Sequence, residues 1–126
     1  MRLSAGWLFG LAAGFNGAVG LSLLLASQAV ANALGLQPVA GSNLLLLYLT
    51  AGFILMFAYA YARIARDPVG FRPLIGFSAL GKTVAVAIML VCWLRGLVDW
   101  RVPALGGGDL VFAGLFLAYL RQRPAA

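Results

Sequence analysis

The sequence contains no histidine, one cysteine (Cys92) and only three acidic residues among its 126 positions. Without histidine, the chain cannot offer a histidine-ligated haem, a histidine zinc site or an imidazole general base. A single cysteine excludes an intrachain disulfide and a paired-thiol redox step, and its apolar neighbours favour a buried, unreactive thiol. We therefore expect no catalytic residue, no metal site and no bound cofactor, and an enzyme is the least favoured class of protein.

Long apolar runs dominate what is present. Hydrophobic residues make up 63% of the chain and charged residues 10%. Because one bilayer crossing needs about 20 predominantly apolar residues, four such runs predict an all-α membrane protein, a four-transmembrane-helix antiparallel bundle. We expect one transmembrane domain over residues 1–126, with helices at about 5–34, 43–65, 73–95 and 103–121.

The positive charge lies at the ends of these runs. The net charge of +6 forms no basic patch, so no nucleic-acid partner is expected. The positive-inside rule places both termini in the cytoplasm, which predicts a multi-pass protein of the inner (plasma) membrane, in contact with the lipid bilayer. The third connection is a mild exception, because it carries Arg95 and Arg101 against Asp99. The cations assigned to the cytoplasmic side are Arg2, Arg63, Arg66, Arg72, Arg121 and Arg123.

The first run has a second interpretation. Arg2, the apolar stretch and the small residues from Ala29 to Ala33 resemble a cleavable secretory signal. The stretch is longer than a typical signal core, however, and this length favours a retained first helix.

Small residues recur at every fourth position of the first helix, and Gly17 broadens the stripe that they form. Such spacing lets two helix backbones approach closely in lipid. The stripe predicts either packing within the same chain or a seam with a second copy or another membrane protein. Its members are Gly6, Gly10, Gly14 and Ala18.

Two charged residues, Lys82 and Asp109, fall within the predicted spans. An ionised side chain at this depth needs a partner, water or a route to the membrane surface. At a rise of about 1.5 Å per residue, they lie about 12 Å and about 18 Å from the cytoplasmic side. The offset leaves two outcomes open: a direct or water-bridged ion pair, or a lysine that extends to the interface.

Three further polar residues lie near this level: Asn16, Thr50 and Ser78. Together with Lys82 and Asp109 they would bring a polar group from every helix into the bundle. One interpretation is a hydrogen-bonded lock that fixes helix register, because a buried polar group without a partner is unfavourable. The other is a polar cavity in the membrane that binds a small molecule or conducts protons.

Three successive glycines, Gly106, Gly107 and Gly108, precede Asp109. They predict either a helix against which another backbone packs closely, or a break that lines a polar pocket. A break would leave too short a helix to cross the membrane, so we favour close packing with Asp109 pointing into the bundle.

Several short motifs, in this order, resemble the DoxX-like group of small bacterial four-helix membrane proteins. They are Gln37-Pro38, Tyr59-Ala60-Tyr61-Ala62-Arg63 with Asp67-Pro68, Gly81-Lys82, and Gly108-Asp109-Leu110 with Phe112 to Phe116.

This resemblance covers most of the chain and implies a four-helix bundle, in some relatives a subunit beside a redox enzyme or a quinone-linked system. Relatives often carry an arginine after the glycine of the third helix and a glutamate in the last helix. The corresponding places here look like Lys82 and Asp109, which keep the charge but not the geometry.

Two functions follow as hypotheses. The first is association, as a homo-oligomer or an accessory subunit of a membrane complex, which the glycine stripe favours. The second is binding or carriage of a small lipophilic or anionic molecule, quinone- or lipid-like, in a pocket around Lys82 and Asp109.

Overall fold

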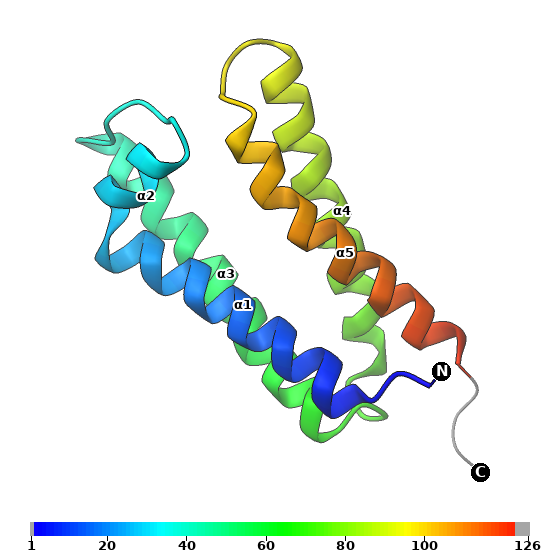
Figure 1. Ribbon diagram of the computed structural model, residues 1–126. Helices are drawn as coiled ribbons and strands as arrows, with labels where there is room; N and C mark the ends of the chain where they lie inside the picture. Colours follow the sequence, from blue (N-terminus) through cyan, green and yellow to red (C-terminus); the bar gives the residue numbers. More distant parts are fainter. Residues whose placement is uncertain (1, 123–126) are drawn as a thin grey trace.

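A computed structural model describes residues 2–122 of the chain, and helices make up nearly all of this part (Figure 1). Four of its five helices are long and apolar enough to cross a membrane. The expected all-α class and the four potential spans are therefore confirmed for the described residues. Arg123, one of the predicted cytoplasmic cations, lies outside them. The helices are α1 (Ala5–Leu25), α2 (Ser27–Ala33), α3 (Ser42–Arg66), α4 (Arg72–Leu94) and α5 (Arg101–Arg121).

The first apolar run does not form the single helix expected over residues 5–34. Ala26 has φ −139° and ψ 42°, which ends α1 and separates it from the seven-residue α2. An unbroken helix of 30 residues would be about 45 Å long, much more than the bilayer core of about 30 Å. After the break, Ala31 is fully buried and the Ala33 carbonyl accepts a hydrogen bond from Arg101 Nη1 at 3.3 Å. These contacts with the rest of the fold hold α2 away from the axis of α1.

Short turns join the long helices. Gly41 has a φ of 60° immediately before α3, a conformation that residues with a side chain rarely adopt. Between α3 and α4, the Gly70 amide donates to Asp67 Oδ1 at 2.9 Å and closes a tight turn. Pro73 occupies the first turn of α4, where its missing N–H leaves no intrahelical hydrogen bond unmade. These turns make α3 and α4 consecutive neighbours around the cavity described below.

The long helices form two pairs (Figure 1). α1 packs along α3 and α4 packs along α5, whereas contacts between the pairs are much fewer. The pairs meet around a buried cluster that includes Phe9, Tyr61, Ile75 and Phe116, and they diverge toward the end that carries α2. We call the end with the buried cluster the terminal end and the opposite end the open end.

Hydrogen bonds fasten the terminal end. The Leu3 amide donates to Gln122 Oε1, and Gln122 Nε2 donates to the Leu3 carbonyl at 3.2 Å, which joins the start of α1 to the end of α5. Arg72 Nη2 donates to the Leu120 carbonyl at 2.8 Å and joins the start of α4 to the same region. The two helix pairs are therefore fixed to each other at one end only.

The outer surface of the helices is strongly apolar. Of the most apolar stretch of each long helix, only 11% to 28% is buried within the chain. Large exposed side chains include Leu45, Met56, Leu80 and Ile88. Such continuous apolar exposure is unfavourable in water, and it is the surface that a multi-pass membrane protein presents to lipid.

Candidate ligand cavity

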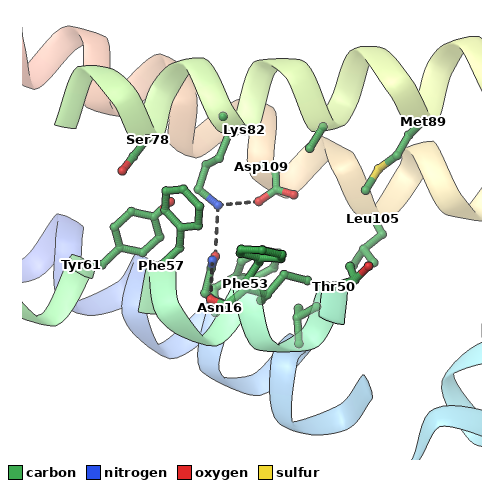
Figure 2. A pocket seen from close by; sticks show the side chains of 15 residues that line it. Asn16, Thr50, Phe53, Phe57, Tyr61, Ser78, Lys82, Met89, Leu105 and Asp109 are labelled. Atoms are coloured by element: carbon green, nitrogen blue, oxygen red, sulfur yellow. Dashed lines mark hydrogen bonds and ion pairs between the residues drawn. The ribbon is translucent and has the colours of Figure 1, made fainter. Parts of the chain in front are cut away.

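A cavity of about 300 Å³ lies between the two helix pairs, and all four long helices contribute to its wall (Figure 2). This volume is at the lower end of the range of small-molecule sites. The wall is mostly apolar, and its charged side chains are Lys82 from α4 and Asp109 from α5. A mostly apolar wall with a few polar groups is typical of sites that bind small molecules.

Helical spacing brings the lining residues of α3 and α4 to the cavity. On α3, Phe53, Phe57 and Tyr61 are four residues apart and therefore lie along one face. On α4, Ser78 and Lys82 have the same spacing, as do positions 85 and 89 further along. Eleven residues separate the first and last of these on α4, so the cavity extends about 16 Å along the helix.

Lys82 is the centre of a hydrogen-bonded chain that links the two helix pairs (Figure 2). Its Nζ donates to Asp109 Oδ1 at 2.5 Å and to Asn16 Oδ1 at 3.1 Å. Asn16 Nδ2 in turn donates to the Ile54 carbonyl of α3 at 3.3 Å. The ion pair that the sequence left open is thus direct, and the Lys82 side chain is only 6% exposed. A lysine that extends to the membrane surface is not what the structure shows.

Three aromatic rings surround the Lys82 ammonium group. Its Nζ lies 5.6 Å from the centroid of Phe15, 5.4 Å from that of Tyr61 and 5.5 Å from that of Phe112. Ring faces attract a cation at such distances, more strongly where water is excluded. The rings therefore help Asp109 to keep the lysine charged inside an apolar protein.

The other two polar residues of the predicted group also line the cavity but stay outside this chain of hydrogen bonds. Thr50 Oγ1 donates to the Leu46 carbonyl of its own helix at 2.8 Å. Ser78 is 1% exposed, and within residues 2–122 its hydroxyl has no hydrogen-bond partner of good geometry, although it lies beside Tyr61. A buried hydroxyl without a partner is uncommon in folded proteins. It marks Ser78 as a polar group that a bound molecule can satisfy.

The three glycines before Asp109 are helical, since they lie inside α5. A Cβ on Gly106 would come within 2.9 Å of Met89 Sδ, and one on Gly108 within 3.1 Å of Phe15 Cζ. A Cβ on Gly107 would meet no described atom within 4 Å. Two of the three glycines therefore allow the close packing that we expected.

The small-residue stripe of α1 does not pack within the described chain. A Cβ on Gly10, Gly14 or Gly17 would find no described atom within 4 Å, and one on Gly6 would meet only Ser4 Oγ, at 3.9 Å. Intrachain packing is instead made by Gly20, where a Cβ would lie 2.7 Å from Leu55 Cγ. The stripe therefore remains free to contact lipid or another protein.

The aromatic lining was missed at the level of sequence. Phe53, Phe57 and Tyr61 repeat every fourth residue on the same helix face as Thr50. This spacing could have been read as one wall of the pocket, but core packing produces the same pattern. Among residues 2–122, no group of three His, Cys, Asp or Glu side chains is arranged to hold a metal ion.

The chain was also compared with protein families, curated proteins and solved structures, and none of these comparisons found a significant match.

Proposed function

We propose that this protein binds a small lipophilic molecule in the cavity between its two helix pairs. One observation supports the proposal above all: a cavity of about 300 Å³ with apolar walls contains a buried Lys82–Asp109 ion pair. A lock that only fixes helix register needs no space beside it. Here Lys82, Asp109 and the unpartnered Ser78 hydroxyl all face the same cavity.

The proposal includes the placement of the protein in a membrane. The four long helices cross the bilayer as an antiparallel bundle, with both termini in the cytoplasm of a bacterial cell. The arginines support this orientation, because Arg63, Arg66 and Arg72 flank the turn at the terminal end, where α5 also ends. The relation to the DoxX-like group, expected from short motifs, belongs to the same proposal.

The cavity can be tested by filling it. Ala85 lines the cavity on α4, and Ala87, two residues later, is exposed and does not line it. Protein purified in mild detergent should carry a co-purifying lipophilic molecule at near one per chain, detected by native mass spectrometry. Ala85→Phe should remove that molecule, whereas the matched control Ala87→Phe should keep it. Absence of any such molecule from the unchanged protein, or its retention by Ala85→Phe, would contradict the proposal.

Association is a second candidate function, and a separate observation favours it. Gly6, Gly10, Gly14 and Ala18 are exposed along one line of α1, and no other helix of the described chain covers Gly10 or Gly14. Close helix contacts in lipid use such small-residue lines. We propose that a second copy of this chain, or a membrane-protein partner, packs against them.

Bulky residues on the line test this association. Gly10→Leu and Gly14→Leu should dissociate an oligomer, as counted by single-molecule photobleaching in nanodiscs. Gly114→Leu is the matched control, because Gly114 is exposed on α5 and a Cβ there would meet no described atom within 4 Å. A chain that is monomeric at all protein densities would count against this second candidate.

A further inference from the structure

The cavity is electrically balanced. Among its lining residues, the charges are one cation, Lys82, and one anion, Asp109, held in contact with each other. The remaining lining residues are apolar or neutral. A charge without a partner is strongly unfavourable inside a membrane. An anionic ligand would leave a net negative charge in the cavity, and a cationic ligand a net positive one.

The ion pair still has unused hydrogen-bonding capacity. A lysine ammonium has three N–H donors, and two of them are used, by Asp109 and Asn16. The third has no acceptor among residues 2–122. Asp109 receives its hydrogen bond through Oδ1, and its other oxygen points away from the lysine (Figure 2). The side chain of Asp109 is 20% exposed, so this oxygen can still accept a hydrogen bond.

One donor and one acceptor therefore stand side by side in the cavity wall. A head group that both accepts and donates, such as a primary amide or an alcohol, can pair with both at once. An ester or a ketone accepts but does not donate, so it pairs with Lys82 alone. A carboxylate would accept from Lys82 but would come close to the carboxylate of Asp109, and like charges repel strongly where water is scarce.

The orphaned hydroxyl of Ser78 is a second, independent indication of a polar ligand group. It lies four residues from Lys82, about 6 Å along α4, on the side of the terminal end. Toward the open end the wall becomes apolar, with Phe53, Met89 and Leu105. The polar head of a ligand therefore fits near Lys82 and Ser78, and its apolar part fits toward the open end.

Resting on the proposed function, we infer that the ligand is a neutral amphiphile whose head group both accepts and donates a hydrogen bond, and that Asp109 is the residue that excludes anions. Asp109 has two effects in this arrangement. It neutralises Lys82, which would otherwise attract carboxylates, and it supplies the acceptor for the ligand's donor.

Three probes with the same chain but different heads test the inference: oleamide, methyl oleate and oleate. Binding is measured with radiolabelled probes in phosphatidylcholine nanodiscs at pH 9, where the oleate carboxyl group is ionised. The unchanged protein should bind oleamide at least about tenfold more tightly than oleate, a difference of about 1.4 kcal/mol. Methyl oleate should bind with intermediate affinity, because it lacks the donor. Equal affinity for oleamide and oleate would overturn the inference.

Asp109→Asn should reverse the preference. The variant retains an oxygen that accepts from Lys82 but leaves the lysine without a counter-ion, so oleate should bind at least about tenfold more tightly than it does to the unchanged protein. The double variant Lys82→Met with Asp109→Asn restores a neutral cavity and should reject oleate again. If Asp109→Asn failed to fold, judged by size-exclusion chromatography and circular dichroism, the three probes on the unchanged protein would still decide.

The two proposals fail in different ways. If no probe binds and no molecule co-purifies with the unchanged protein, the proposed function itself is wrong. If a molecule does bind and Ala85→Phe removes it, the cavity is a ligand site. In that case, equal binding of oleamide and oleate, or unchanged oleate binding by Asp109→Asn, would refute only the assignment of a neutral ligand.

Discussion

Replacing Lys82 by methionine is the most direct test of the ion pair. Methionine keeps a long apolar side chain but removes the ammonium group that contacts Asp109 and Asn16. Breaking a buried pair by removing one partner costs about 3–5 kcal/mol in proteins. A central charge in a membrane helix costs about 2.5–3.5 kcal/mol. Because the Asp109 side chain is 20% exposed, we expect the lower part of these ranges, a loss of about 2–3 kcal/mol in the free energy of unfolding.

Protonation of Asp109 does not relieve this loss. Neutralising a carboxyl group of ordinary pKa at pH 7 costs about 4 kcal/mol, since its usual pKa is about three units lower and each unit is worth about 1.4 kcal/mol. Removing both charges is different, because no unpaired ion then remains. The double variant Lys82→Met with Asp109→Asn should therefore recover most of the stability lost in Lys82→Met.

Steric trapping in bicelles measures the required free energies of unfolding, and a double-mutant cycle isolates the pair. We expect a coupling energy of at least about 1.5 kcal/mol between Lys82 and Asp109. Thr83→Val is the matched control, because Thr83 is exposed on the same helix and its hydroxyl donates to the Ala79 carbonyl. It should change stability by less than about 0.5 kcal/mol. A loss below that value for Lys82→Met, with no coupling, would refute the ion pair as a stabilising contact.

Three further predictions concern packing, pH and the fastening of the terminal end. Gly20→Ala should destabilise the fold by about 1–3 kcal/mol, because its Cβ would lie 2.7 Å from a leucine of α3, while Gly17→Ala should be neutral or slightly stabilising; thermal unfolding in detergent compares them. The Arg101 side chain, by hydrogen bonding, lowers the pKa of Asp99 below its ordinary value of 3.8. The stability from this contact is therefore present above that value and is lost as pH falls through the lower folded-state pKa, and Asp99→Asn should abolish this acid-dependent change in unfolding. Gln122→Ala should cost about 1–2 kcal/mol through two lost hydrogen bonds, and hydrogen exchange should quicken at the start of α1; unchanged exchange there would contradict the fastening.

Hydropathy was sufficient to predict four of the five helices, because length and apolar content are properties of each segment alone. The same reasoning placed Lys82 and Asp109 at nearly the same depth from a fixed rise per residue. Their contact could not be predicted, since it depends on rotation of α4 and α5 about their axes and on side-chain direction. The break at Ala26 was also missed. No proline or glycine marks that position, and the contact with Arg101 that accompanies it comes from a distant part of the chain.

The glycines show a second limit of sequence reasoning. Gly14 and Gly20 are both small residues of α1 at positions suited to close packing, yet only Gly20 faces α3. In lipid, apolar residues outside and inside a bundle have the same character, so hydrophobicity does not tell which face of a helix turns inward. Polar residues carry that information instead. Asn16, four residues before Gly20, lies on the same inward face and is 7% exposed.

The lock and the cavity, weighed as alternatives from the sequence, are formed by the same atoms. The ion pair joins α4 to α5 within one helix pair, so it is complete without the other pair. The Lys82–Asn16 hydrogen bond crosses to the other pair at the level of the cavity. Since the pairs are fastened at the terminal end and diverge beyond it, this one bond limits how far they separate around a ligand. Asn16→Leu should therefore widen the cavity and leave the ion pair intact, which distance measurements between spin labels on α1 and α4 can detect. An unchanged distance distribution would show that apolar packing alone holds the pairs together.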